Sequence, residues 1–255
     1  MTEVVHYAVA DGVARLTLDS PHNRNAISTA LAEQLNQRLA DAAADPSVRV
    51  VVLGHTGGTF CAGADLSEAA GREPGELAEF RAREATQMLR SILELPVPVI
   101  AAVDGHVRAG GMGLIGACDL VVAGAASTFA LTEARIGVAP SIISLTLLPK
   151  MTARAAGRYF VTGEKFDAAE AERIGLITVA TDDVPGTVAA LTSEITKGSP
   201  QGLRISKSLT TAAILEGFDR HADELARQSA GLFVSEEARE GMLAFLQKRA
   251  PNWPS

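Results

Sequence analysis

Three short apolar runs constrain this chain more than any other feature of its sequence. They span Val48–Leu53, Val99–Val103 and Leu120–Ala123, and almost no polar residue interrupts them. A strand with one face in water alternates apolar and polar residues, whereas a strand covered on both faces is apolar throughout. The segment Glu76–Leu93 has the apolar periodicity of a covering helix. We therefore expect an α/β fold whose parallel strands are joined by right-handed crossovers.

The N-terminal residues predict a hairpin followed by a capped helix. Val4–Ala10 and Val13–Leu18 have the composition of strands, and Asp11-Gly12 between them is typical of a two-residue hairpin turn. Ser28 can accept a hydrogen bond from the first turn of the next helix, which the Asp-Pro pair at 45–46 should end.

From Ser141 onward the sequence becomes mostly helical. Periodic segments near Arg204–Ala213, Phe218–Leu232 and Glu236–Arg249 each predict a helix. No Ser/Gly-rich linker separates this region from the strands before it. We expect a core over residues 1–195 and a helical C-terminal region over residues 196–255.

Composition excludes several classes of protein. The chain has 255 residues, of which 47% are hydrophobic and 21% charged, close to the averages of a globular protein. Its net charge of −7 argues against nonspecific binding to nucleic acid or to an anionic membrane surface. No apolar stretch is long enough for a membrane span and no signal peptide precedes the first strand, so we expect a cytoplasmic protein. Cys61 and Cys118 should be buried thiols.

Two segments rich in small residues lie where a strand gives way to a helix. They are residues 60–65, Phe-Cys-Ala-Gly-Ala-Asp, and residues 109–113, Ala-Gly-Gly-Met-Gly. Small residues let a ligand reach the backbone, and free N–H groups at a helix start favour negative charge. Two such ends facing one carbonyl oxygen would stabilise an oxyanion. The alternative is that the small residues only allow a helix to pack closely on a strand.

Other motifs carry less information. The spacing G-x-G-x-x-G at residues 111–116 matches a dinucleotide site, but several residues separate it from the preceding strand and the next strand ends in Gly124. The five histidines show no metal-ligand spacing, so we expect no metal. The stretch 71–87 is rich in Glu and Arg, with an i,i+4 pair of Glu79 and Arg83. It is either a solvated helix face or a lid over a pocket.

Several motifs together resemble the crotonase (enoyl-CoA hydratase/isomerase) family over nearly the whole chain. The resemblance rests on residues 59–66, Thr-Phe-Cys-Ala-Gly-Ala-Asp-Leu, and on the segment Ala102–Gly111 with Cys118-Asp119. Residues 110–114 and 132–140 are similar to a bacterial subgroup related to methylglutaconyl-CoA hydratases. The resemblance implies a spiral of ββα repeats and a C-terminal helical region that forms trimers or dimers of trimers.

The resemblance also implies roles for individual residues. The backbone N–H groups of Ala64 and Gly110 would bind the carbonyl oxygen of an acyl-CoA thioester, and Glu133 would act as acid and base. Typical hydratases of the family carry a second glutamate, and its position is Gly113 in this chain. The coenzyme A portion of the substrate would be the only cofactor-like group. Residues implied along its path are Arg24, Ala26, Ala62, Ala64, Asp65, Leu66, Ser67 and, from the C-terminal region, Lys248.

Each of these roles has an alternative. Glu133 could form a salt bridge with Arg135, and Arg24 could be a solvated surface cation. Arg108 could bind a second carboxylate of the acyl group or lie exposed, and His106 could support the site or make a local hydrogen bond. A lone glutamate suits hydration of a 2-enoyl-CoA, which we favour, or a Δ3,Δ2-enoyl-CoA isomerase. A paralogue that binds acyl-CoA without catalysis is the third possibility.

Overall fold

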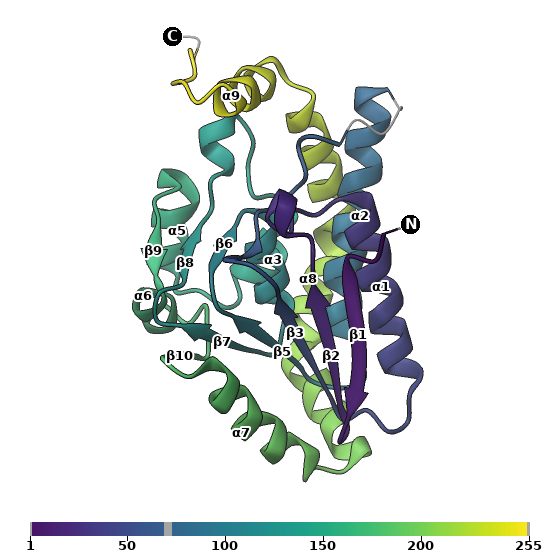
Figure 1. Cartoon of the computed structure of the whole chain (residues 1–255). Coiled ribbons are helices and arrows are strands. Elements are labelled where there is room, and N and C mark those ends of the chain that lie inside the picture. The colour runs from purple at the N-terminus through teal and green to yellow at the C-terminus, as the bar shows by residue number, and fades with distance from the viewer. Residues whose placement is uncertain (1, 69–72, 254–255) are drawn as a thin grey trace.

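The computed structural model describes residues 2–68 and 73–253. Its larger sheet has six strands in the order β1-β2-β3-β5-β7-β10 (Figure 1), and all neighbours except the antiparallel β1–β2 pair are parallel. The strands of this sheet are β1 (Val5–Ala10), β2 (Val13–Leu18), β3 (Val50–His55), β5 (Val99–Val103), β7 (Leu120–Gly124) and β10 (Val179–Thr181). The predicted parallel arrangement is confirmed.

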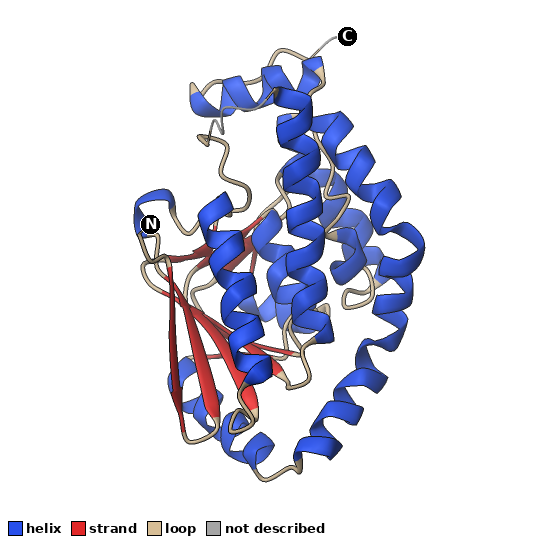
Figure 2. Cartoon of the chain, turned by 90° about the vertical axis from the view of Figure 1, so that its right-hand side faces the viewer, coloured by secondary structure: helices blue, strands red, loops and turns tan. Residues whose placement is uncertain are grey.

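Helices cover both faces of this sheet, which explains the uninterrupted apolar runs. In β3, Val51 and Leu53 belong to the main hydrophobic core, whereas Val50 and Val52 belong to a smaller cluster on the opposite face. The helix α7 (Val184–Thr196) supplies Val188 to that smaller cluster. The helices α1 (Thr29–Ala44), α2 (Pro74–Glu94) and α8 (Pro200–Phe233) pack over the main core (Figure 2).

The hairpin and the helix cap form as predicted. Asp11 and Gly12 both have positive φ, 52° and 77°, so their turn follows the twist of the flanking strands. The Ser28 side chain accepts a hydrogen bond from the backbone N–H of Leu31 at 3.2 Å, and α1 ends at Ala44. These two signals act within a few residues, which is why the sequence suffices to locate them.

A second, four-stranded sheet has the order β4-β6-β8-β9 and packs beside the first. The first three strands are mutually parallel, and β9 is antiparallel to β8. A long strand of the first sheet, a short strand of the second and a helical segment recur along the chain, as the ββα repeat requires. The bounds are β4 (Thr59–Cys61), β6 (His106–Arg108), β8 (Thr128–Ala130) and β9 (Phe166–Asp167). The short helices are η1 (Pro21–Asn23), α3 (Gly110–Ala117), η2 (Glu133–Ile136), α4 (Ser144–Leu147), α5 (Ala153–Thr162) and α6 (Ala168–Arg173).

The C-terminal region differs from the prediction in one respect. The two segments expected before residue 233 form a single helix of 34 residues, α8. Packing on α2 keeps α8 continuous, and Ile214, 5% exposed, lies between the two segments that were expected to be separate. Lys207 ties α8 to the sheet, because its ammonium group bonds Asp119 Oδ2 at 2.8 Å and the carbonyl oxygen of Ile92 at 2.8 Å. The boundary expected at residue 195 stays a prediction.

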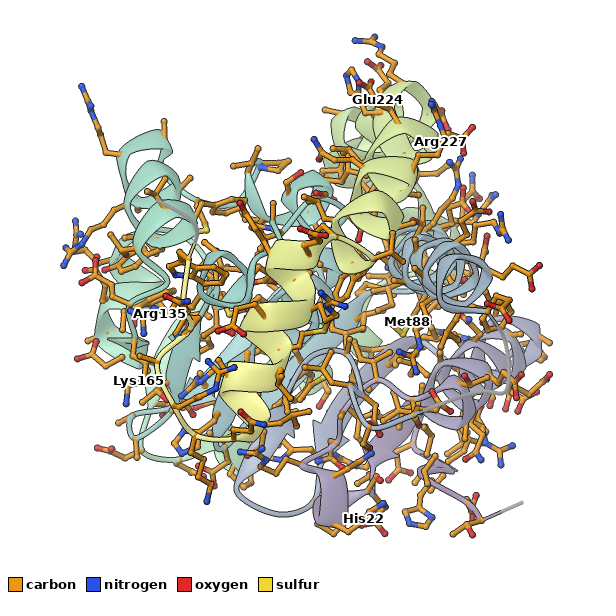
Figure 3. All side chains as sticks on the ribbon, turned by 90° about the horizontal axis from the view of Figure 1, so that it is seen from above. His22, Met88, Arg135, Lys165, Glu224 and Arg227 are labelled. Atoms are coloured by element: carbon orange, nitrogen blue, oxygen red, sulfur yellow. The ribbon has the colours of Figure 1, made fainter. Side chains whose placement is uncertain are left out.

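The last helix, α9 (Glu236–Leu246), lies across one end of the molecule. Seen from above, it passes between the side that carries Arg135 and Lys165 and the helix α2 with Met88 (Figure 3). It packs against η2 through backbone contacts. A Cβ at Gly137 would lie 2.5 Å from the carbonyl carbon of Glu237, so only glycine fits there.

The Glu/Arg-rich stretch lies partly outside the described residues, at positions 71 and 72. Its described remainder belongs to α2, where Arg83 and Glu79 form the predicted pair at 3.6 Å. Cys61 and Cys118 are buried free thiols, as expected. Among the described helices, none combines the length and hydropathy of a membrane-spanning segment.

Candidate active site

Three parallel strands of the second sheet, β4, β6 and β8, end at the same edge. Ala64, Gly110 and Glu133 follow those three ends within three residues. The backbone N–H of Ala109 donates to the carbonyl oxygen of Ala130 at 3.1 Å, which joins the ends of β6 and β8. The structure therefore brings the three residues predicted for catalysis to one edge of one sheet.

The backbone N–H of Ala64 points away from Ile27, the residue with which Ala64 pairs. Ile27 forms a parallel bridge with Ala64: its N–H donates to the Gly63 carbonyl at 2.7 Å, and its carbonyl accepts from the Asp65 N–H at 3.1 Å. In such a bridge the central residue turns its own N–H and C=O to the other side. The Ala64 N–H is therefore not used by Ile27, and the Ala64 residue is exposed.

The amide of Gly110 lies beside that of Ala64. Gly110 is the first residue of α3, so its N–H has no acceptor within the helix. A Cβ at Gly110 would lie 3.8 Å from the Ala64 nitrogen, and a Cβ at Gly63 would lie 3.2 Å from the Gly110 nitrogen. Ala109, at φ 46° and ψ −120°, sets the peptide plane that carries the Gly110 N–H. The small residues thus permit a close approach of the two loops.

Glu133 is a buried carboxyl group with one unpartnered oxygen. The residue is 8% exposed, and Oε2 has no hydrogen bond within the described residues. Burial raises the pKa of the Glu133 carboxyl to about 7. The expected alternative, a salt bridge to Arg135, is wrong: Arg135 is exposed and its Nε donates to the Thr162 carbonyl at 3.1 Å. A carboxyl group that titrates near neutral pH can both accept and return a proton.

The space beside Gly113, where the resemblance implies a second glutamate in typical hydratases, is filled by an apolar side chain. A Cβ at Gly113 would overlap Ile143, lying 2.9 Å from its Cβ and closer to its Cγ2. The Thr146 hydroxyl donates to the Gly113 carbonyl at 3.1 Å and fixes α4 against α3. A glutamate at position 113 therefore cannot be accommodated without moving α4. No pattern in the sequence indicated this contact between residues thirty positions apart.

The residues implied for the coenzyme A path lie on two adjoining segments. The Ala62 N–H donates to the Arg24 carbonyl at 3.2 Å, and Asn23 Nδ2 donates to Asp65 Oδ2 at 3.0 Å. Asp65 also accepts from the Ser67 hydroxyl at 2.6 Å. Ala26 is buried, Leu66 is half-buried, and the Arg24 side chain is exposed.

Lys248, the last residue implied for the coenzyme A path, lies in the C-terminal region. It follows α9 with φ 54°, and in the described part of the chain its ammonium group makes no hydrogen bond or ion pair. Sequence reasoning placed Asn25 only within the segment 23–26 that the resemblance implies along the coenzyme A path, and it did not foresee that the fully buried Asn25 side chain organises this region. Its Oδ1 accepts from the Ser20 N–H at 2.6 Å, and its Nδ2 donates to the Thr59 carbonyl at 2.8 Å. Asn25 thus fixes the loop before Ile27 to the start of β4.

Arg108 and His106 make local contacts. Arg108 is half-buried rather than exposed, and it donates to the Thr128 carbonyl at 2.6 Å and to the Thr128 hydroxyl at 2.7 Å. Burial lowers the pKa of its guanidinium. His106 Nδ1 is 2.9 Å from the same hydroxyl, as the local alternative predicts. These bonds cross-link β6 and β8.

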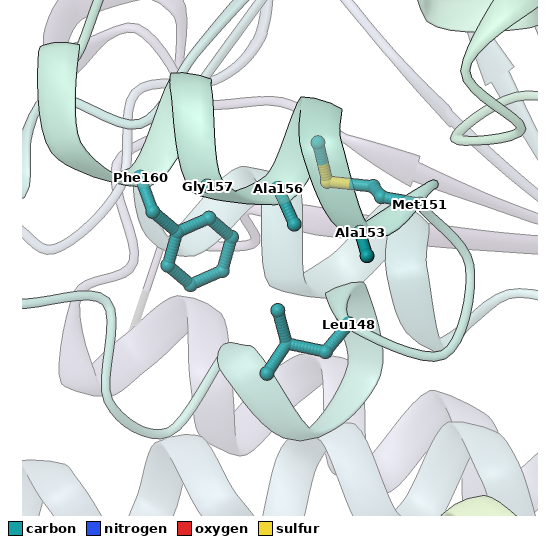
Figure 4. Close-up of a pocket in the computed structure, with 6 residues that line it drawn as sticks. All are labelled: Leu148, Met151, Ala153, Ala156, Gly157 and Phe160. Atoms are coloured by element: carbon teal, nitrogen blue, oxygen red, sulfur yellow. The ribbon is translucent and has the colours of Figure 1, made fainter.

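An apolar pocket of about 340 Å³ lies elsewhere, between α4 and α5 (Figure 4). Its lining carries no acid, base or charged side chain, so it offers no catalytic chemistry. The lining residues are Leu148, Met151, Ala153, Ala156, Gly157 and Phe160.

The ββα repeats with paired loops at the sheet edge define the crotonase fold that the sequence resemblance indicated. A sequence model of the enoyl-CoA hydratase/isomerase family matches residues 8–255, and the chain belongs to this family of enzymes. The crystal structure of an enoyl-CoA hydratase from Mycobacterium avium is 63% identical, with a TM-score of 0.93 and 100% of each chain covered. A carnitinyl-CoA dehydratase of Proteus mirabilis is 30% identical, with 99% of both chains covered. A mevalonyl-coenzyme A hydratase of Aspergillus fumigatus is 31% identical over 93% of this chain and 90% of its own.

Proposed function

We propose that this protein is a hydro-lyase that adds water to a 2-enoyl-CoA thioester. The observation that carries the proposal is a buried carboxyl group, Glu133, whose Oε2 has no partner within the described residues. It lies at the sheet edge where the amides of Ala64 and Gly110 are side by side. The names of two relatives support it, since one is a hydratase and the other a dehydratase of a CoA ester.

The two amides stabilise the negative charge that develops on the thioester oxygen. When water attacks C3 of the enoyl group, electron density moves through C2 to the carbonyl oxygen and gives an enolate. Backbone N–H groups of Ala64 and Gly110 are held by the sheet and by the Ile27 bridge, so they need no reorganisation as the charge appears.

Glu133 handles the proton. Its carboxylate accepts a proton from the attacking water and returns it to C2, so hydroxide ends on C3 and Glu133 is regenerated. A pKa of about 7 suits both steps, because the group neither holds nor releases the proton too strongly at neutral pH. These reaction steps use no metal ion and no redox cofactor. Turnover that persists in the presence of a chelator would agree with this.

The isomerase is the second candidate, favoured by one observation. Ile143 fills the space beside Gly113, so no second carboxylate fits there and Glu133 remains as the candidate base. One base can move a proton between C2 and C4. Product mass separates the two reactions: hydration adds one water, whereas isomerisation leaves the mass unchanged. Tight binding of an acyl-CoA panel without turnover would instead identify a non-catalytic paralogue.

Substitution of Glu133 tests the mechanism. Glu133→Gln keeps the shape of the side chain and removes its basicity, so turnover should fall by about 10²-fold or more. Binding of the CoA thioester should change little, because the Ala64 and Gly110 amides remain. Unchanged turnover in a folded Glu133→Gln protein would remove Glu133 from the reaction.

The implied coenzyme A path remains part of the proposal. The exposed cation Arg24 would contact a phosphate of coenzyme A, and backbone groups of residues 62–67 would line the way to Ala64. Arg24→Ala should therefore raise KM and leave kcat nearly unchanged. Lys248 would contact coenzyme A bound to a neighbouring subunit.

The same proposal includes a homo-oligomeric assembly, which is either a trimer or a dimer of trimers. Apolar side chains of α9 and the residues after it are exposed, which is typical of surfaces that a partner covers. Light scattering after gel filtration would measure the assembly, and a monomer would overturn this part. The exposed residues are Leu243, Phe245, Leu246 and Trp253.

A further inference from the structure

A second buried oxygen without a partner lies on the segment that follows Glu133. Ser141 is 6% exposed, and its hydroxyl has no hydrogen bond within the described residues. The backbone of the same residue is fully used, since its N–H donates to the Ala139 carbonyl at 2.8 Å and its carbonyl accepts from the Ser144 N–H at 3.2 Å. Only the hydroxyl of Ser141 is free to bind something else.

Nearby hydroxyls behave differently, which makes the free hydroxyl informative. Ser144 Oγ donates to the Ser141 carbonyl at 2.6 Å, and the single hydrogen of Thr146 Oγ1 is shared between the Gly113 and Ile143 carbonyls, each at 3.1 Å. Such bonds to a preceding carbonyl are the usual way in which a buried hydroxyl is satisfied. A buried hydroxyl that lacks one indicates a partner outside the protein, such as a water molecule or a substrate.

Both ends of this segment border the candidate site. At one end Glu133 follows β8, whose last residue, Ala130, is bonded to the loop that carries Gly110. At the other end Ile143 packs on Gly113, one turn along α3 from Gly110. The carbonyl of Glu133 accepts from the Val138 N–H at 3.1 Å, so the chain turns back on itself between these ends. Ser141 therefore belongs to a segment held against the site at two points.

We propose that the Ser141 hydroxyl, together with Glu133, binds the water that adds to C3 of the substrate. This inference rests on the proposed hydratase function. Ile143 fills the space beside Gly113 with methyl groups, so no carboxylate there can hold the water. Glu133 Oε2 and Ser141 Oγ are the two unpartnered buried oxygens of this segment within the described residues.

The step is balanced between these two groups. One hydrogen of the water bonds to Glu133 and the other to Ser141 Oγ, which leaves a lone pair of the water oxygen directed at C3. The new C–O bond forms as the C2=C3 electron pair moves toward the thioester oxygen. The first hydrogen passes to Glu133 and then to C2, while the second stays in the new hydroxyl group and keeps its bond to Ser141.

The test compares two serine-to-alanine variants in the full-length protein. Ser141→Ala removes a hydroxyl with no protein partner. Ser127→Ala removes an equally buried hydroxyl at the other end of β8, which accepts from the Gly105 N–H at 3.1 Å. Each variant is assayed for hydration of crotonyl-CoA and for exchange of the C2 hydrogens of butyryl-CoA in heavy water. The exchange needs the oxyanion contacts and Glu133 but no attacking water.

The two variants should change different measurements. Ser141→Ala should lower kcat for hydration about 10-fold, with little change in KM or in C2–H exchange, and its thermal midpoint should not fall. Ser127→Ala should lower the thermal midpoint and leave hydration unchanged. Normal hydration by Ser141→Ala, or a parallel loss of hydration and exchange, would overturn the role of Ser141. A wild-type protein that exchanges C2–H but hydrates no 2-enoyl-CoA would overturn the hydratase function instead.

Discussion

Replacing Glu133 with glutamine should remove activity. It should also make the protein more stable than the wild type, by an amount that grows as the pH rises. The folded protein binds the Glu133 proton with a pKa of about 7 because burial disfavours the carboxylate, against an ordinary value of 4.5. Below the ordinary pKa both the folded and the unfolded states are protonated, so Glu133 has no effect on stability. As the pH rises the unfolded state ionises first, and the folded state loses stability until it too ionises near pH 7.

The magnitude follows from the two pKa values. Each pH unit between them is worth about 1.4 kcal/mol, so the carboxylate destabilises the free enzyme by about 1 kcal/mol at pH 5 and about 3 kcal/mol at pH 8. Glutamine has no charge to bury and escapes this penalty. The advantage of Glu133→Gln over the wild type should therefore grow by about 2 kcal/mol between pH 5 and pH 8.

Urea unfolding at fixed protein concentration measures this difference, because an oligomer makes the midpoint depend on concentration. Glu79→Gln is the matched control: Glu79 is exposed on α2 beside Arg83, and its loss should change the free energy of unfolding by less than about 0.5 kcal/mol. A difference between wild type and Glu133→Gln that stays the same at both pH values would refute the argument that burial raises the pKa of Glu133.

Three further predictions follow from the same contacts. The kcat/KM for hydration should rise with pH and level off above about pH 7, where Glu133 is ionised; a flat pH–rate profile would contradict this. Gly113→Glu should destabilise the fold by about 2 kcal/mol or more because it overlaps Ile143, and Ile143→Ala in the same chain should recover part of the loss in denaturant melts. Lys207→Met should lower the free energy of unfolding by about 3 kcal/mol, since the largely buried Asp119 loses its cation; adding Asp119→Asn should restore some of it.

The turn, the helix cap and the burial of a strand on both faces could be predicted from the sequence. The Asp11-Gly12 turn, the Ser28 cap and the two-sided strand Val50–His55 each depend on residues close together in the chain or on simple periodicity. The loops that hold Ala64 and Gly110 could be found for the same reason, since small residues at strand ends are visible in the sequence.

Contacts between distant residues could not be predicted. Ile143 against Gly113 and Lys207 against the Ile92 carbonyl depend on how whole helices pack, and no short pattern encodes them. The alternative considered for Glu133, a salt bridge with Arg135, is wrong for a different reason. Residues two apart on a 3₁₀ helix point in different directions, so Glu133 turns inward while Arg135 turns outward to Thr162.

The contact between α9 and η2 also limits how this protein can evolve. Gly241 on α9 would place a Cβ against the backbone of Ile136, and Gly137 would place one against the backbone of Glu237. Because each position faces main chain and not a side chain, no second substitution can make room for the first. The C-terminal helix and the turn that carries Glu133 must therefore both keep their glycines, even though the two segments lie far apart in the sequence.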